Sequence, residues 1–301
     1  MLPDAMTMPP KLFVLGSCRV HRPARLLHDG GLAQPLTAGI SGYIHSTREA
    51  VQRVQWLADR TRLDSQLLPF MFPAGRTPVV TPARADELAQ ADAVLVEAAS
   101  ERSVSVNGVF LQKNLVVKHL VRELGDEGRN WWRSLVRAGE VAPEAYEAVA
   151  GLYRDQAEET VLAGGLRVLR EARCAEDSEA VVRADLMYLA LRLGKPVLVV
   201  THVDAERADG RRIAARVRHV ARIKAAARGL HQVHVIDPLD AAPDWPPARL
   251  LASDGADMNH YSPEFEPVLA GYMHTRIRAA LAASSGALAP SQFLPEYQDG
   301  P

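Results

Sequence analysis

Short apolar runs alternate with amphipathic stretches along most of this 301-residue chain. Continuous apolar runs between polar residues are typical of buried parallel strands, and they occur at residues 11–16, 36–40, 93–96, 196–201 and 231–236. Apolar positions at helical spacing predict helices at residues 19–27, 178–193, 211–228 and 263–284, and another from a Ser46 or Thr47 cap to Trp56. Because strands alternate with helices, we predict an α/β fold of three layers on a mostly parallel, doubly wound sheet of the flavodoxin-like type.

One stretch departs from this alternation. From about Val109 the pattern is helical and amphipathic over a length too great for a single crossover helix. We therefore predict one domain over residues 1–301 with a helical insertion at 109–178. Residues 66–82 hold four prolines and predict a loop. The Ala-, Ser- and Pro-rich end predicts a loose C-terminal tail at 285–301.

Composition excludes several classes of protein. Lys plus Arg number 35 and Asp plus Glu number 36, so the formal net charge is −1, which argues against DNA binding by a polycation and against a charged disordered chain. No apolar stretch approaches the roughly 18 residues of a membrane span, so we expect no membrane insertion. The two cysteines, Cys18 and Cys174, are too few for a disulfide framework or a four-thiolate zinc site. We expect a reduced, cytoplasmic protein without a metal.

Two segments carry residues suited to chemistry. In open α/β sheets, functional residues gather at the carboxyl ends of the strands, and Gly16-Ser17-Cys18 closes the first strand there. A thiolate at such a turn faces the positive end of the next helix, which favours its ionisation; a cysteine that merely fills space is the alternative. Asp257-Met258-Asn259-His260 forms a loop before the last helix. There Asp257 could orient His260 as a general base, or simply cap the helix.

Together these segments resemble the SGNH/GDSL hydrolase superfamily, whose nucleophile follows the first strand and whose Asp-x-x-His element lies near the C-terminus. The resemblance implies a triad of Cys18, His260 and Asp257, with Ser17 in place of the family's Asp and as an alternative nucleophile. The Gly-Ser-Cys start is similar to outlying branches, the GSCFA-type proteins and the WcbI-like proteins of capsule polysaccharide biosynthesis, for which acyl transfer has been proposed. The family's Gly-x-Asn-Asp element is absent, because the third strand ends in Glu97-Ala98-Ala99-Ser100.

Four further residues are candidates for the oxyanion or substrate site. Gly42 lies where the superfamily has a backbone N–H for the oxyanion, although it also suits a plain turn. Ser100 could offer a hydroxyl in place of the missing Asn. Glu97 is either a polar anchor or a partner for a substrate amine or hydroxyl. His45 either lines the cleft or belongs to the cap of the following helix.

The helix at 211–228 is unusually basic, with seven cations in eighteen residues and an apolar stripe. Such a pattern usually marks a solvated surface face, but it would also suit a phosphate-rich ligand. The candidates for binding such a ligand are Arg211, Arg212 and Arg216 at the helix start, with Arg19 beside the thiol.

These observations predict an acyltransferase of a biosynthetic pathway, which moves an acyl group through a Cys18 thioester to a hydroxyl or amine acceptor. We expect no bound cofactor. The small-molecule acyl donor would be a coenzyme A thioester or another phosphate-bearing carrier, including an acyl carrier protein or an aminoacyl-tRNA. The alternatives are an esterase or thioesterase with the same triad, and a non-catalytic binding protein of SGNH-like fold, which the missing Asn suggests.

Overall fold

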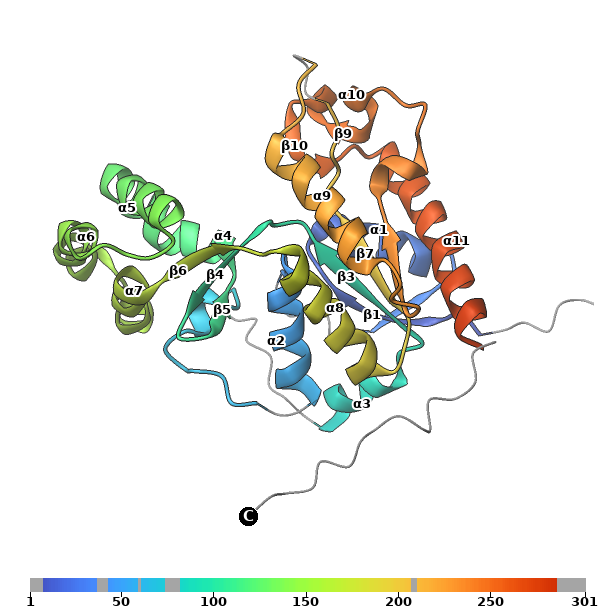
Figure 1. Ribbon diagram of the computed structural model, residues 1–301, viewed down its shortest axis with the longest axis horizontal. Coiled ribbons are helices and arrows are strands. Elements are labelled where there is room, and N and C mark those ends of the chain that lie inside the picture. The colour runs from blue at the N-terminus through green and yellow to red at the C-terminus, as the bar shows by residue number, and fades with distance from the viewer. Residues whose placement is uncertain (1–7, 37–42, 59–60, 74–81, 207–209, 286–301) are drawn as a thin grey trace, which may run out of the picture.

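The computed structural model describes residues 8–36, 43–58, 61–73, 82–206 and 210–285. Its body is a twisted sheet between helices, and a helical lobe extends from one side (Figure 1). Among the described residues, the central sheet has five parallel strands in the order β2-β1-β3-β7-β8. These strands are β2 (Gln34–Leu36), β1 (Lys11–Leu15), β3 (Ala93–Ala98), β7 (Val197–Thr201) and β8 (Val233–Ile236). The three-layer α/β prediction is confirmed.

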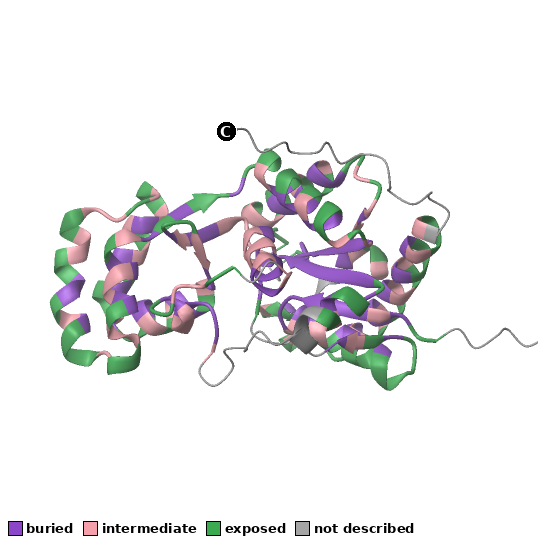
Figure 2. Ribbon diagram, turned by 90° about the horizontal axis from the view of Figure 1, so that it is seen from below, coloured by how far each residue is buried: buried purple, intermediate pink, exposed green. Residues whose placement is uncertain are grey.

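Alternate side chains of the strands pack against two different sets of helices. Leu12 and Val14 join one buried cluster with α1 (Cys18–Asp29) and α11 (Phe265–Ser285). Phe13 and Leu15 join the other, on the face covered by α2 (Thr47–Ala58), α8 (Glu179–Leu193) and α9 (Ala214–Ala227). Figure 2 shows the strands as the buried centre between these helices. Burial on both faces explains why these segments are continuous apolar runs rather than alternating ones.

Serine side chains begin several of these helices. Ser46 Oγ accepts the Glu49 N–H at 3.3 Å and donates to the Glu49 carboxylate at 3.1 Å before α2. Ser178 Oγ accepts the Val181 N–H before α8. Ser46 is one of the two caps that the sequence predicts, and Ser178 has the same role, because in each case a short side-chain oxygen satisfies an N–H of the first turn.

The lobe differs from its prediction. Within the described ranges, β4 (Arg102–Val106), β5 (Val109–Leu111) and β6 (Arg173–Glu176) form a three-stranded antiparallel sheet, order β5-β4-β6. Asn107 and Gly108 turn the β4–β5 hairpin with positive φ angles of 49° and 81°, as the favoured two-residue turn requires. The helical interpretation of 109–178 was therefore wrong for both ends of that segment, which are strands.

Helices fill the interval between β5 and β6. They are α4 (Lys113–Val116), the π-helix η3 (Val117–Arg122), α5 (Gly125–Ala138), α6 (Pro143–Gln156) and α7 (Glu159–Glu171). Their buried side chains, among them Trp131, Tyr153 and Leu169, belong to the same apolar cluster as Phe13 and Leu15 of the central sheet. The lobe is thus packed onto the body through continuous core.

Several boundaries also differ from prediction. The basic helix α9 begins at Ala214 rather than 211, and α1 begins at Cys18. The second strand is described over Gln34–Leu36, and the rest of the predicted strand, residues 37–40, lies outside the described part, as does the tail from residue 286. Two short elements occur within or beside the expected 66–82 loop, η2 (Leu68–Phe70) and α3 (Pro82–Gln90).

The chain between β8 and α11 forms small elements. These are η4 (Pro238–Ala241), α10 (Pro247–Leu250), β9 (Leu251–Ala252), η5 (Ser253–Gly255) and β10 (Asp257–Tyr261). The Asp257–His260 segment is therefore a strand paired antiparallel with β9, not the predicted loop. None of the described helices is long and apolar enough to cross a membrane.

Candidate active site

A cavity of about 820 Å³ opens at the carboxyl edge of the central sheet. The segments that follow β1, β3 and β7 contribute Cys18, Ser100 and His202 to its wall. From β1 the chain continues to β2 on one side and reaches β3 on the other, which makes this the point where such folds hold ligands. The lobe closes the opposite side with Lys113, Lys118 and Arg122 of α4 and η3. Cys18, His45, Ser100, Arg216 and His260, all candidates from the sequence, line this cavity.

Cys18 is the first residue of α1 and is partly exposed to the cavity. Ser17 is the N-cap of this helix and only 3% exposed. Its Oγ accepts the Arg19 N–H at 3.4 Å. Both candidate nucleophiles line the cavity, but the serine is nearly buried and its hydroxyl accepts from the first turn of the helix, whereas Cys18 is partly exposed at the positive end of the helix dipole.

Glu97 fixes this turn from below. It belongs to the buried strand β3 and is only 1% exposed, which is unusual for a carboxylate. Its Oε2 accepts the backbone N–H of Ser17 at 2.5 Å, and its Oε1 lies 2.5 Å from the Arg19 guanidinium. A Cβ on Gly16 would lie 3.0 Å from the Glu97 Cβ, so a glycine lets the two strands' ends approach this closely.

The charge of Glu97 is stabilised by these contacts. Burial raises the pKa of a carboxyl, but here Arg19, His45 and the Ser17 N–H outweigh burial and lower the pKa of Glu97 below its usual range. Of the two interpretations that the sequence left open, the geometry fits the polar anchor. The partner Arg19 is itself 8% exposed, so both members of this ion pair lie within the protein.

His260 and Asp257 meet on β10. The Asp257 Oδ2 lies 2.7 Å from Nδ1 of His260, and the Asp257 Oδ1 accepts the Asn259 N–H at 2.8 Å. The Asn259 N–H and the His260 ring lower the pKa of the Asp257 carboxyl. An ionised carboxylate on Nδ1 holds the proton there and leaves Nε2 of the neutral ring as the acceptor, the tautomer that a general base requires.

Arg216 ties β10 to α9. Its guanidinium donates to the Met258 carbonyl at 2.6 Å and to the Asn259 side-chain oxygen at 3.0 Å. Burial and the nearby Arg19 lower the pKa of Arg216 to about 10, so the side chain stays charged at neutral pH. It thereby holds the residues between Asp257 and His260.

The remaining oxyanion and substrate candidates have separate positions. His45 accepts the backbone N–H groups of Ala99 and Ser100 through its carbonyl, each at 2.8 Å. Its ring lies 3.8 Å from Glu97 and 3.2 Å from the Asn114 amide. The Ser100 hydroxyl donates to the Arg102 carbonyl at 2.8 Å, so that proton is already engaged. Gly42 lies outside the described residues.

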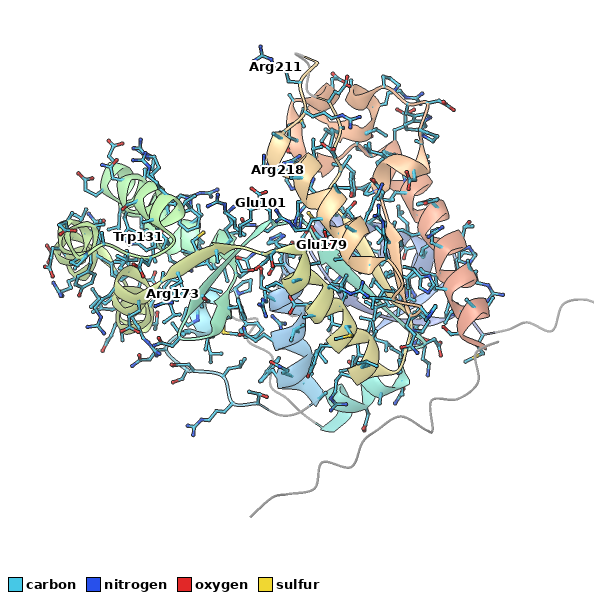
Figure 3. The ribbon with its side chains drawn as sticks, in the orientation of Figure 1. Glu101, Trp131, Arg173, Glu179, Arg211 and Arg218 are labelled. Carbon is cyan, nitrogen blue, oxygen red and sulfur yellow. The ribbon has the colours of Figure 1, made fainter. Side chains whose placement is uncertain are left out.

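The cations of the cavity are mostly not those expected. Arg211 and Arg212 are exposed in the segment before α9, and Figure 3 shows Arg211 far from Glu101 at the cavity wall. Arg212 lies near Asp204 and Glu206 instead. Neither lines the cavity, because the helix starts later than predicted. The sequence interpretation missed other cations that do, namely Arg102, Lys113, Lys118 and Arg122. The sequence around these four cations does not indicate a role in the cavity, because it does not show that the lobe packs against the edge of the sheet.

Two histidines of the cavity wall were also missed. His202 follows β7, and His219 lies on the inner face of α9. They are 5% and 3% exposed. A histidine directly after a buried strand was the available signal for His202, whereas the inward orientation of His219 depends on how α9 packs. Among the described residues, no three His, Cys, Asp or Glu side chains gather as metal ligands would.

The arrangement has the parts of a nucleophilic site. A thiol at a helix N-terminus and a carboxylate-oriented imidazole open into one cavity, whose walls are otherwise rich in cations. A thiol beside such a base can form covalent intermediates with acyl groups, and the cations suit a substrate with negative charge.

Comparison with known proteins identifies the family of this chain. Residues 10–276 match the TviD N-terminal domain family. The Vi polysaccharide biosynthesis protein TviD of Salmonella typhi is 24% identical over 257 residues, which cover 84% of this chain and 30% of that protein. The chain thus spans less than a third of the length of this relative. No solved structure matches the chain significantly. The match to the family covers most of the chain, and the chain belongs to the TviD N-terminal domain family.

Proposed function

We propose that this protein is an acyltransferase of polysaccharide biosynthesis, which carries an acyl group on Cys18 and transfers it to a sugar hydroxyl. The observation that carries the proposal is that Cys18 and His260, whose ring contacts Asp257, line one cavity at the carboxyl edge of the sheet. The similarity to a Vi polysaccharide biosynthesis protein supports the biosynthetic role. The SGNH-like triad and the thioester are part of the proposal.

In the first step, His260 Nε2 takes the proton of the Cys18 thiol, and the sulfur attacks the carbonyl carbon of a donor thioester. The tetrahedral intermediate collapses with loss of the donor thiolate, which takes the proton back from His260 and leaves an acyl group on Cys18. The positive end of α1 stabilises negative charge on the attacking sulfur and on the oxyanion. A thiol needs less activation than a serine hydroxyl, which favours Cys18 over Ser17, the N-cap of α1.

In the second step, the acceptor hydroxyl attacks the Cys18 thioester. His260 removes the hydroxyl proton as the new ester bond forms, and Cys18 leaves as a thiolate, which recovers that proton. Asp257 holds the ring orientation in both steps. The acyl group moves from donor to acceptor, and the enzyme returns to its starting state.

The cations of the cavity favour a donor that bears phosphates. Arg102, Lys113, Lys118 and Arg122 lie on the lobe side, and Glu101 is the acidic residue among the described wall residues. A coenzyme A thioester suits this wall; an acyl carrier protein or an aminoacyl-tRNA presents similar phosphate chemistry. This interpretation replaces Arg211 and Arg212 as the donor site with the lobe cations. A reduced thiol nucleophile also fits the cytoplasmic location that we expect.

A hydrolase with the same triad is the second candidate, because the cavity is open and water could replace the acceptor. The two functions differ only in the acyl acceptor, which is a sugar hydroxyl in the transferase and water in the hydrolase. Product analysis with acetyl-coenzyme A, in the presence and absence of a sugar acceptor, separates them: a transferase yields an acetylated sugar, whereas a hydrolase yields acetate at a rate that the sugar does not change.

The test of the proposal is intact-mass detection of the acyl-enzyme after mixing with acetyl-coenzyme A. We expect an acetyl adduct on the wild type and on Ser17→Ala, and none on Cys18→Ala. Cys174→Ala is the matched control, since Cys174 is the other cysteine and is buried away from the cavity. An adduct that survives Cys18→Ala contradicts the proposal. Absence of any adduct and of turnover favours a non-catalytic binding protein.

A further inference from the structure

His202 and His219 lie in the wall of the active-site cavity but have no part in the proposed triad. Both rings are almost completely buried, at 5% and 3% exposure, and both contribute to the cavity surface. A buried polar side chain normally has a hydrogen-bond partner in the protein. His219 departs from that rule, which points to a missing partner for its ring.

Neither ring nitrogen of His219 makes a hydrogen bond within the described structure. Burial and the nearby Arg222 lower the pKa of His219 to about 4, against the opposite effect of the Ala98 carbonyl, which lies within reach of the ring without forming a well-aligned hydrogen bond. The imidazole is therefore neutral at physiological pH. A neutral imidazole has one N–H donor and one bare nitrogen acceptor, and leaving both unused in a buried place is costly.

His202 offers an acceptor. Its Nδ1 lies 3.0 Å from the Val203 carbonyl oxygen, which can only accept, so Nδ1 carries the hydrogen. Burial, with Arg19 and Arg216 nearby, lowers the pKa of His202 well below its ordinary value. The ring is thus neutral, and its Nε2 is left with a lone pair and no proton.

The surroundings limit the kind of group that would satisfy these rings. A cation or metal ion is disfavoured, because Arg19, Arg216 and Arg222 act on the two histidines with positive charge. An anion needs donors, and the His202 Nε2 lone pair would repel it. A hydroxyl group fits, since it both donates and accepts. Its proton suits His202 Nε2, and its oxygen suits the N–H of His219.

We propose that His202 and His219 form a neutral subsite that binds a hydroxyl of the acceptor other than the one that is acylated, and so selects which hydroxyl meets Cys18. This inference rests on the proposed acyl transfer. The lobe cations would hold the charged donor, whereas this wall, between β7 and α9, would recognise the uncharged acceptor. A site built to hydrogen-bond a hydroxyl discriminates strongly against an analogue that lacks it.

The test separates loading of Cys18 from discharge to an acceptor. Enzyme acetylated by acetyl-coenzyme A is discharged either with hydroxylamine, which needs no subsite, or with methyl hexosides and their monodeoxy analogues. For His219→Leu we expect unchanged loading and unchanged discharge by hydroxylamine. Discharge to the best hexoside should fall by about 10- to 100-fold, the usual consequence of losing a buried polar partner. Most of that loss should be an increase in the acceptor KM.

The deoxy analogues make the test specific. In the wild type, removal of one hydroxyl that is not acylated should weaken transfer by a similar factor, and in His219→Leu that same removal should have no further effect. His219→Gln keeps a donor and an acceptor and should recover part of the activity. His234→Gln is the matched control, because His234 is also a partly buried histidine with an unpartnered nitrogen but lies outside the cavity. It should behave as the wild type.

Two results would overturn the inference. Transfer to all hexosides at the wild-type rate by His219→Leu would show that the ring does not contact the acceptor. An equal loss with hydroxylamine, accompanied by a lower Tm, would show a structural role. If the wild type forms no acetyl adduct, the proposed function fails, and binding of the same hexosides, measured by saturation-transfer NMR, still decides the subsite: weaker binding to His219→Leu supports it, and equal binding contradicts it.

Discussion

The two halves of the proposed triad are held by different kinds of structure. Cys18 follows a central strand, and its turn is fixed by Glu97, which is 1% exposed and bonded to Ser17 and Arg19. His260 lies on a two-stranded ribbon at the surface, where its side chain is 47% exposed and that of Asp257 36% exposed. The proposed nucleophile therefore follows a turn anchored in the core, whereas the proposed base lies on a ribbon attached to it.

This difference separates stability from activity. Residues that hold the thiol are buried and charged, so their loss should affect folding and catalysis together. Residues that hold the imidazole make hydrogen bonds near the surface, where single contacts contribute little to folding. Arg216 links the ribbon to α9 through two hydrogen bonds. Variants on the two sides should therefore have different signatures, and the predictions below are ways to break that pattern.

The base side should give the largest loss of activity. His260→Ala should lower kcat by about 10²- to 10⁴-fold, because a positioned general base contributes that much. Asp257→Asn should act on the same step with a smaller effect. Melting temperatures should stay close to that of the wild type, since both side chains are substantially exposed. Near-normal kinetics in both variants would exclude this pair as the base and move attention to His45.

The nucleophile side should give a loss of stability as well. Glu97→Gln leaves the buried Arg19 without its counter-charge, which should lower the free energy of unfolding by about 3–5 kcal/mol. Urea denaturation measures this quantity, and His260→Ala is the comparison. A variant as stable as the wild type would show that the buried pair is not what fixes the turn.

The same variant should change how stability depends on pH. The pKa of Glu97 is lowered on folding, so its contribution is complete above the unfolded pKa of about 4.5 and is lost as pH falls toward the folded value. The difference in unfolding free energy between wild type and Glu97→Gln should therefore shrink below about pH 4.5. A constant difference down to pH 3 would contradict this assignment.

Arg216 should give the smallest effect and the sharpest contrast. If it holds β10, Arg216→Gln should lower kcat by about 10-fold, with little change in Tm or in the donor KM. If it binds donor phosphates, as the sequence suggested, the donor KM should rise instead, and the effect should fade with salt. Arg212→Gln is the matched control, because Arg212 does not line the cavity, and it should change neither parameter.

The sequence reveals the body of this protein far better than its lobe. Buried parallel strands are continuous apolar runs, and their topology brings their carboxyl ends together, so Cys18 could be assigned to one edge without coordinates. The β4–β6 pairing joins Arg102 to Glu176 across the whole lobe, and no local pattern reports so distant a partner. The Asn107-Gly108 turn was a readable signal that the helical interpretation passed over.

For the site, the same division holds. Two candidates chosen from strand ends or a short motif, Cys18 and His260, line the cavity, and Asp257 contacts His260. Lys118 and His219 were not, because their place in the cavity depends on how the lobe and α9 pack against the sheet. Side chains that reach a site only because two elements pack together do not form a recognisable motif in the sequence.

The central claim is that the exposed imidazole acts on the thiol of the buried turn. The rate at which iodoacetamide alkylates Cys18 at pH 7, followed by peptide mass spectrometry, tests this without any substrate. His260→Ala should slow the alkylation by about 10-fold, whereas Arg212→Gln should leave it unchanged. An alkylation rate in His260→Ala equal to that of the wild type would show that His260 does not act on Cys18 and would contradict the proposed triad.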